Sequence, residues 1–400
     1  MSPTVRLIEP FPQAYDWGKL GMSSMVAKLI QAGYRTSIDS GKPYAELWMG
    51  DHPNGPCGVL DDGTSHPIGE ILNSYSMGSL PFLFKVLSVR KALSIQSHPD
   101  AALAQKLHAE FPDIYKDPNP KPELAVALTP FRALFGFRPV EEIVLMFDSL
   151  PDLLRVIPFA SVARLRASLT VQSSKEQDSA LKEAYSFLMH SSSQDVEATI
   201  NAVIATGRRI QGSLVSTAVA LAEELNRQFP GGDVGVLSVF FLNIVDLEPG
   251  QCIFMGPNVP HAYVSGDLIE CMTCSDNVIR GGLTPKFKDV KTLLASLDFT
   301  CTVPSLLQPE LVDGLFPCWS LPDVPFAVTR YQLSEKSVNI HSSPCGPSIC
   351  LFMEGSGKIG DFEFKSGQCV LLAPNEFYTL DCSSSHVDMF LAFTPDLGRE

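Results

Sequence analysis

The fold of this chain is decided by the stretch Gly250-Gln251-Cys252-Ile253-Phe254-Met255-Gly256-Pro257-Asn258, which recurs in similar form as Gly367-Gln368-Cys369-Val370-Leu371-Leu372-Ala373-Pro374-Asn375. Each copy has a glycine turn, an apolar run of strand length and a Pro-Asn turn, a unit typical of a jelly-roll barrel. The repeat predicts two related barrels. When the alignment is continued, His261 of the first copy matches Tyr378 of the second. We therefore expect the first barrel to carry a ligand that the second has lost.

A helical region interrupts this β pattern. Residues 1–139 are rich in glycine, proline and aromatic residues with short apolar runs, which predicts antiparallel strands. Residues 140–233 predict helices, and a capping box of Ser174 and Gln177 precedes the clearest one. Apolar residues there recur at helical spacing: Leu181, Ala184, Tyr185 and Leu188. The β pattern resumes at Val234, so the expected fold is mainly β with an α-helical insert.

The expected domain boundaries follow from these regions. Residues 1–139 and 234–298 form the two parts of the first barrel, residues 140–233 form the helical insert, and residues 299–400 form a degenerate second barrel. At roughly 150 residues per domain, a chain of 400 residues has room for two or three such units.

The net charge restricts the partners. Lys and Arg total 30 against 44 Asp and Glu, which gives a formal charge of −14. A surface this negative repels nucleic acid and anionic lipid, so we expect neither as a partner. An anionic ligand would need a local group of basic residues.

The N-terminal stretch and the cysteines predict a cytoplasmic protein. The stretch Met1–Pro12 lacks the apolar core of a secretory signal, and the apolar run Val234–Val245 is too short to span a bilayer. Cys271 and Cys274 form a C-x-x-C pair without a second pair to complete a zinc ribbon. We expect the ten cysteines to be reduced and mostly buried.

Two histidines stand in unusual contexts. His98 follows a strand-like run, in which Gln96 lies two residues earlier and Ser94 four, so all three would share one side of the strand. Pro99 ends the strand pairing and places His98 near a barrel mouth. His261 directly follows the first Pro-Asn turn.

Glu123 begins an apolar run, where a buried carboxylate must be paired or bound to metal. Two imidazoles, one carboxylate and an open position make a common catalytic zinc shell. Each of these residues taken alone is more often structural than a ligand. Both interpretations therefore stand at this point.

A basic segment lies between Asp276 and Lys291. It holds four cations against Asp276 and Asp289: Arg280, Lys286, Lys288 and Lys291. Gly281 and Gly282 would let the backbone approach a ligand closely. Glu270 and Asp276 are near Arg280 in sequence, so a carboxylate could act beside a fixed cation. The alternative is an ordinary solvated loop.

Several separated motifs carry a family resemblance. They are Ala14-Tyr15-Asp16-Trp17-Gly18, Tyr44-Ala45-Glu46-Leu47-Trp48-Met49-Gly50, Phe84-Lys85-Val86-Leu87-Ser88, Ser94-Ile95-Gln96-Ser97-His98-Pro99-Asp100, Lys121-Pro122-Glu123, Pro257-Asn258-Val259-Pro260-His261-Ala262-Tyr263, Ser275-Asp276-Asn277-Val278-Ile279-Arg280 and Leu283-Thr284-Pro285-Lys286. In this order they resemble the type I phosphomannose isomerases, a zinc-dependent family with cupin-type jelly-roll barrels. The resemblance is strong over residues 1–139 and 234–290.

The resemblance implies the site. One zinc ion per chain would be bound by four residues: Gln96, His98, Glu123 and His261. Arg280 would be the catalytic arginine, and the substrate phosphate would lie near Ser94, Lys121 and Arg280. We also expect Lys85 and Tyr263 in the substrate site.

The implied reaction interconverts mannose 6-phosphate and fructose 6-phosphate through a cis-enediol, and it would supply mannose phosphate for GDP-mannose and glycosylation. We assign the catalytic base to Glu270, with Lys286 and Lys121 as alternatives, and expect Asp276 to orient Arg280 or to help ring opening. The expected protein is a cytoplasmic monomer with a sugar phosphate as its substrate.

Two other classes of protein are alternatives. An iron oxygenase of the same barrel type would use two histidines and one carboxylate, and the amide of Gln96 argues against it. A non-enzymatic sugar-binding double barrel fits the degenerate second copy. It does not fit the ligand set in the first.

Overall fold

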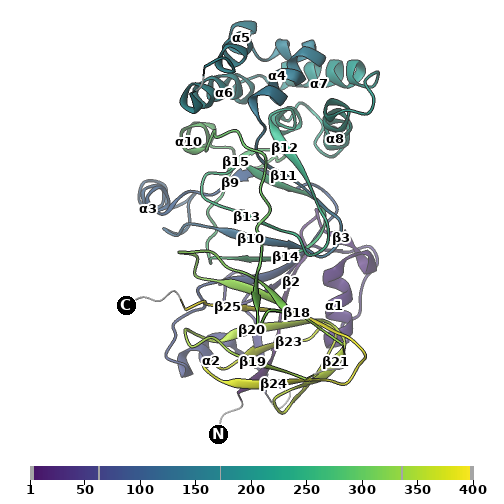
Figure 1. Ribbon diagram of the computed structural model, residues 1–400, viewed down its shortest axis with the longest axis vertical. Coiled ribbons are helices and arrows are strands. Elements are labelled where there is room, and N and C mark those ends of the chain that lie inside the picture. Colours follow the sequence, from purple (N-terminus) through teal and green to yellow (C-terminus); the bar gives the residue numbers. More distant parts are fainter. Residues whose placement is uncertain (1–3, 62–63, 172, 335–336, 397–400) are drawn as a thin grey trace.

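The computed structural model describes residues 4–61, 64–171, 173–334 and 337–396. Three layers follow one another along the long axis of the molecule (Figure 1): a group of helices at one end, a sheet in the middle and two further sheets at the other end. The structure is thus mainly β with helices, as predicted. None of the helices in the described ranges is long and apolar enough to span a membrane.

The middle sheet has ten strands and carries the candidate site. Its path runs β12-β11-β14-β8-β5-β2, and β10, β13, β9 and β15 attach beside it. The strands are β2 (Phe11–Gln13), β5 (Glu46–Met49), β8 (Leu83–Val89), β9 (Ile95–Ser97), β10 (Glu123–Ala127), β11 (Phe131–Phe137), β12 (Leu242–Leu247), β13 (Cys252–Met255), β14 (His261–Met272) and β15 (Ile279–Gly282). The long strand β14 is central, because it pairs with β8, β9, β10 and β11.

A nine-stranded sheet packs against the middle one. In spatial order it contains β16 (Glu310–Val312), β17 (Phe316–Trp319), β18 (Ala327–Leu333), β25 (Val387–Phe393), β20 (Ser348–Glu354), β23 (Cys369–Leu372), β1 (Val5–Glu9), β6 (Gly58–Asp61) and β7 (Thr64–Pro67). Alternate residues of β23 face opposite layers: Leu371 packs toward the middle sheet, and Val370 packs toward the outer one.

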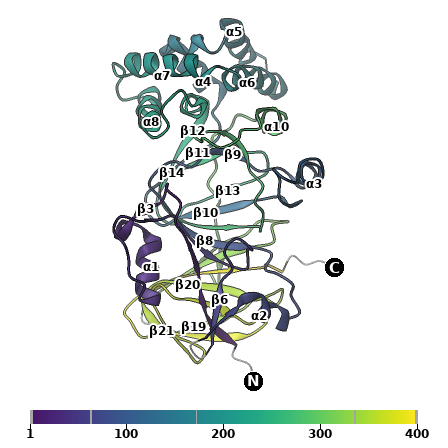
Figure 2. The same ribbon diagram turned by 180° about the vertical axis from the view of Figure 1, so that it is seen from behind.

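The outer sheet has four strands, in the order β19 (Val338–His341), β24 (Phe377–Cys382), β21 (Ser356–Ile359) and β22 (Phe362–Lys365). A two-stranded ribbon joins β3 (Lys19–Leu20) to β4 (Pro43–Tyr44). Helix α1 (Met25–Tyr34) lies along the side of the sheets in Figure 2, and α2 (Ile68–Ser74) lies near the N-terminal end.

Three strands near the N-terminus lie in a different sheet from the one expected. Strands β1, β6 and β7 were expected in the first barrel, with the rest of residues 1–139. Instead β1 pairs with β23, with Val5 opposite Leu372, and β6 pairs with β1. The apolar alternation of Val5, Leu7 and the neighbouring residues suits either sheet. Local sequence therefore does not determine the partner strand.

The helical layer consists mainly of α4 (Val140–Ser149), the 3₁₀ helix η2 (Pro151–Arg155), α5 (Phe159–Ser168), α6 (Ser174–Met189), α7 (Ser193–Gly207) and α8 (Leu214–Gln228). The predicted face of α6 is completely buried: Leu181, Ala184, Tyr185 and Leu188. The predicted capping box is wrong, because Ser173 is the extended residue before α6 and Ser174 is already helical. Such a box instead starts α8, between Ser213 and Ser216.

The remaining helices lie between the helical layer and the middle sheet or beside that sheet. They are the 3₁₀ helix η1 (Gly21–Ser23), α3 (Ala101–Glu110), α9 (Val234–Ser238) and α10 (Val290–Ser296). The β pattern was expected to resume at Val234. In the structure Asp233 caps α9 by accepting a hydrogen bond from Gly235 N, and the next strand begins at Leu242.

The internal repeat has the same backbone form in both copies. Gly250 and Gly367 have φ of 87° and 82°, and Asn258 and Asn375 have φ of 65° and 58°. Each copy places a four-residue strand, β13 or β23, between these turns. The side-chain oxygen of each glutamine accepts a hydrogen bond from the backbone three residues earlier, at 2.8 Å for Gln251 and 3.0 Å for Gln368. The two copies of the repeat are therefore similar in structure as well as in sequence.

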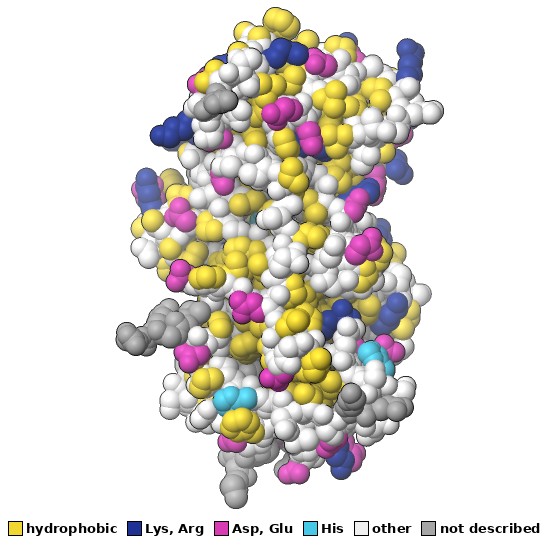
Figure 3. All heavy atoms as spheres, in the orientation of Figure 1, with side chains coloured by type: hydrophobic (Ala, Val, Ile, Leu, Met, Phe, Trp, Pro, Cys, Tyr) yellow, Lys and Arg dark blue, Asp and Glu magenta, His cyan; other side chains and the backbone are white. Residues whose placement is uncertain are grey.

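The surface in Figure 3 carries acidic and basic side chains interspersed over all three layers. The ten cysteines are free thiols, and six of them are buried, including Cys271 in β14.

Candidate metal centre

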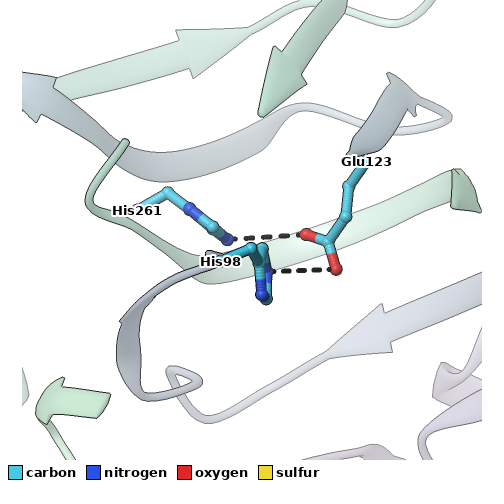
Figure 4. A group of neighbouring side chains, drawn as sticks. All are labelled: His98, Glu123 and His261. Atoms are coloured by element: carbon cyan, nitrogen blue, oxygen red, sulfur yellow. Dashed lines mark ion pairs between the residues drawn. The ribbon is translucent and has the colours of Figure 1, made fainter. Parts of the chain in front are cut away.

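Three predicted ligands meet where three strands begin or end. His98 directly follows β9, Glu123 begins β10 and His261 begins β14. Their ligand atoms lie within 4.8 Å of one another, and all three residues are buried. As Figure 4 shows, the carboxylate of Glu123 points between the imidazoles, with distances of 3.3 Å to His98 Nε2 and 3.4 Å to His261 Nε2.

Backbone carbonyls fix how the two imidazoles are protonated. His98 Nδ1 lies 2.8 Å from Asn277 O, and His261 Nδ1 lies 2.9 Å from Val259 O. A carbonyl oxygen only accepts hydrogen bonds, so each Nδ1 carries the proton and each Nε2 keeps its lone pair. Burial also lowers the pKa of His98 to about 4, which keeps this ring neutral. Both rings thus present a ligand nitrogen to the same point.

Three polar atoms at that point lack a hydrogen-bond partner among the described residues. His98 Nε2, His261 Nε2 and Glu123 Oε2 are buried without a hydrogen bond. Burial opposes the ionisation of Glu123, yet the neighbouring groups, Lys121 among them, outweigh it and hold the pKa of the carboxyl well below its usual range. Two neutral nitrogens and one carboxylate are a donor set that fits a divalent metal such as Zn²⁺. A cation would satisfy the atoms that the protein leaves unpaired.

Gln96 lies next to this group. It is opposite His261 on β14 and opposite Arg280 on β15 in the strand register. Ser94 Oγ donates a hydrogen bond of 3.5 Å to Gln96 Oε1. The structure thus places the fourth predicted ligand opposite His261, on the strand that ends just before His98.

A second buried polar group lies deeper in the middle sheet. Lys85 and Glu270 are opposite each other on β8 and β14, and their charged atoms are 3.1 Å apart. Tyr263 OH donates to the other oxygen of Glu270 at 2.9 Å. Burial raises the pKa of Glu270, although Lys85 opposes this. Both oxygens of Glu270 are therefore held.

Glu46 and Trp48 also belong to this polar group, and neither received a role from the sequence. Lys85 Nζ is 3.6 Å from Glu46, and its ammonium lies over the ring of Trp48, whose Nε1 donates to Glu46. Burial opposes the charge on Lys85, but Glu46 and Glu270 outweigh it and raise the lysine pKa. Glu46 begins an apolar strand, which is the same signal that identified Glu123.

Asp276 was expected to orient Arg280 or to help ring opening, and in the structure its carboxylate contacts His52 and Asn54. Asp276 Oδ1 lies 3.4 Å from His52 Nε2, and Asn54 Nδ2 donates to Oδ2 at 3.1 Å. The hydrogen bond from His52 lowers the pKa of Asp276. The pairing joins two loops that are far apart in sequence, which a local motif does not reveal.

Arg280 instead lines a cavity of about 250 Å³. Other lining residues include Tyr15, Trp17, Ser94 and Lys286. Burial lowers the pKa of Arg280, but a guanidinium remains charged at neutral pH. Lys121, expected near the phosphate, lies 3.3 Å from Glu123. The basic residues therefore divide between the cavity and the metal centre.

A buried donor set of two histidines and one glutamate, next to a cavity lined by cations, defines a metal-dependent protein suited to a small anionic ligand. Comparison with known proteins identifies the particular family. Residues 5–140 match the family described as phosphomannose isomerase type I, catalytic domain.

Curated relatives extend the match over most of the chain. The mannose-6-phosphate isomerase of Cryptococcus neoformans var. neoformans serotype D is 42% identical over 395 residues, which cover 90% of this chain and 91% of the relative. The Homo sapiens enzyme is 42% identical over 354 residues, which cover 80% and 82%. The chain belongs to the type I phosphomannose isomerase family.

Solved structures agree in fold. A zinc-bound mannose 6-phosphate isomerase superposes with a TM-score of 0.82 at 26% identity, covering 98% of this chain and 100% of the other. The Salmonella typhimurium enzyme bound to fructose 6-phosphate and zinc gives a TM-score of 0.81 at 25% identity with the same coverage.

Proposed function

We propose that this protein interconverts mannose 6-phosphate and fructose 6-phosphate with one zinc ion per chain. The observation that carries the proposal is the meeting of His98, Glu123 and His261, in which both Nε2 atoms and Glu123 Oε2 are buried without a hydrogen-bond partner among the described residues. Gln96 is the fourth ligand. Its neutral amide adds a donor without adding charge, and this separates the set from a simple two-histidine, one-carboxylate iron site.

A zinc ion held there supplies positive charge where negative charge develops on the sugar oxygens in the enediol-like transition state. The protein supplies the rest. Arg280 directs a rigid, permanently charged guanidinium into the cavity and binds developing negative charge from the other side. Because this charge is larger in the transition state than in the substrate, the interaction accelerates the reaction.

Glu270 is the group that removes the proton from the carbon next to the carbonyl. A catalytic base must be ionised and yet basic. Burial raises the pKa of Glu270 and makes it more basic, while Lys85 keeps it charged. Tyr263 holds the second oxygen in place. Asp276, held by His52 and Asn54 at the edge of the site, assists ring opening.

The phosphate binds in the cavity that Ser94, Arg280 and Lys286 line. Lys286 is exposed there and suits the phosphate better than the proton transfer. Lys121 contacts Glu123 and faces the sugar end of the substrate. The net negative charge repels an anion, but salt screens the distant surface charges, and the few cations placed at the cavity act at short range and outweigh them.

We further assign the sheets to two cupin-type jelly-roll barrels, with residues 140–233 as an insert in the first and residues 299–400 forming most of the second. The second copy has lost its metal site. Tyr378 replaces His261, and its hydroxyl donates to Thr4 O at 2.9 Å. Ser348 lies opposite Leu372 as Glu123 lies opposite Met255. We place the protein in the cytoplasm as a monomer that supplies mannose phosphate for GDP-mannose and glycosylation; its free thiols support a reducing compartment.

A coupled assay that follows fructose 6-phosphate formed from mannose 6-phosphate, together with elemental analysis, tests the function. We expect activity that a chelator removes and zinc restores. Oxygen consumption after iron loading, without isomerisation, would favour the oxygenase alternative.

A further inference from the structure

The corner where the helical layer meets the middle sheet contacts both loops that border the phosphate cavity. This corner consists of residues 228–233, between the end of α8 and the start of α9. In Figure 1, α8 lies next to the end of the middle sheet that carries β12 and β15, and Figure 2 shows α8 next to β12 from behind.

Asp233 holds the first loop, which follows Arg280 and β15. Its Oδ1 accepts hydrogen bonds of 2.7 Å from both Gly235 N and Leu283 N, and its Oδ2 accepts one of 3.1 Å from Thr284 N. Leu283 has a φ of 54°, a conformation that costs free energy for a residue with a side chain. The bonds to the charged carboxylate stabilise that conformation.

Close packing makes the same contact rigid. A Cβ on Gly282 would come within 2.5 Å of Gly235 Cα, so the two backbones touch. Thr284 connects this contact to Lys286, because Thr284 Oγ1 accepts a hydrogen bond of 3.1 Å from Lys286 N. The placement of Lys286 in the cavity wall thus depends on the contact that Asp233 makes.

Gln228 holds the second loop, which leads to Ser94. Its Oε1 accepts a hydrogen bond of 2.8 Å from Ala92 N. Beside it, Lys91 Nζ lies 4.7 Å from the ring centre of Phe229, in cation–π contact. Phe229 and Lys91 both line the cavity of about 250 Å³.

We propose that residues 228–233 set the geometry of the phosphate cavity, and that Asp233 is a positioning residue that aligns Lys286 with Arg280. The helical layer then contributes to substrate binding without touching the reacting atoms. This inference rests on the proposed function, because it takes the cavity as the phosphate site. It predicts that damage to the corner weakens phosphate binding and leaves the proton transfer largely intact.

The test compares the zinc-loaded wild type with Asp233→Asn. The new amide has a single acceptor oxygen, so its NH₂ group must face a backbone N–H that a carboxylate oxygen had accepted. The matched control is Ser213→Ala, which removes the cap of α8 in the same layer but contacts neither loop. Two quantities are measured: KM and kcat for mannose 6-phosphate, and the Kd of inorganic phosphate by calorimetry.

For Asp233→Asn we expect KM and the phosphate Kd to rise together by about tenfold, with kcat changed by less than about threefold. Ser213→Ala should leave both constants at the wild-type values while lowering the melting temperature. If Asp233→Asn shows the same KM and phosphate Kd as Ser213→Ala, the proposal is overturned. Calorimetry also separates the two proposals, since it reports on Asp233 even if the wild type shows no isomerase activity.

A second variant decides the matter if Asp233→Asn does not fold. Gln228→Met removes the acceptor for Ala92 N and keeps a side chain of similar length. A rise of about threefold in KM and in the phosphate Kd supports the positioning role of the corner. Unchanged constants in that folded variant overturn it.

Discussion

Lys85 and Glu270 face each other across β8 and β14, with the ammonium 3.1 Å from the carboxylate in the buried part of the middle sheet. A second carboxylate, Glu46, lies 3.6 Å from the same ammonium. One buried cation therefore contacts two buried acids, and the ionisation of the proposed base depends on it.

Removal of the base tests its assignment. Glu270→Gln keeps the shape and the contact with Tyr263, but the amide cannot accept a proton at neutral pH. We expect kcat to fall by at least about 10² with zinc content unchanged. A variant with full zinc and a kcat close to wild type would remove Glu270 from this role.

The pH profile should report on the same group. Burial raises the pKa of Glu270, and the base must be ionised to act. Activity is therefore lost as pH falls through a value above the ordinary glutamate range. The acid limb of kcat/KM should disappear in Glu270→Gln when residual activity is measured. An acid limb that is unchanged in the variant would assign it to another group.

Loss of the buried cation should destabilise the fold. Lys85→Met leaves Glu46 and Glu270 buried without their counter-ion, and we expect a loss of about 3–5 kcal/mol in the free energy of unfolding. Urea denaturation measures it. Lys358→Met is the control, since Lys358 pairs with Glu363 on the surface and should contribute about 1 kcal/mol or less. Equal effects of the two variants would argue against the buried network.

Arg280 is expected to act on the transition state. Arg280→Ala should lower kcat by at least about 10² while zinc stays bound, because the guanidinium stabilises charge that develops during the reaction. Steady-state kinetics with metal analysis checks this. A rise in KM with an unchanged kcat would make Arg280 a residue that binds substrate and transition state equally.

The sequence predicted the elements that depend on neighbouring residues. The buried face of α6, the two Pro-Asn turns and the strand that ends just before His98 all follow from local spacing. Contacts between distant segments were missed. The pairing of β1 with β23 depends on which sheet edge is free, and the contact of His52 with Asp276 joins loops whose spacing carries no signal.

The metal ligands also divide into what local sequence predicts and what depends on distant contacts. His98, Glu123 and His261 could each be identified as unusual, but only the resemblance joined them, since no local rule brings β9, β10 and β14 to one point. Glu46 satisfied the rule that identified Glu123, a charge at the start of an apolar strand, and received no role.

We propose that His98, Glu123 and His261 hold the zinc ion on which the isomerase activity depends. The most direct measurement is the zinc content of purified His98→Ala, determined with its fructose 6-phosphate production from mannose 6-phosphate. We predict that both fall well below wild type, because the remaining donors leave the site one imidazole short. Full zinc occupancy in that variant would contradict the assignment.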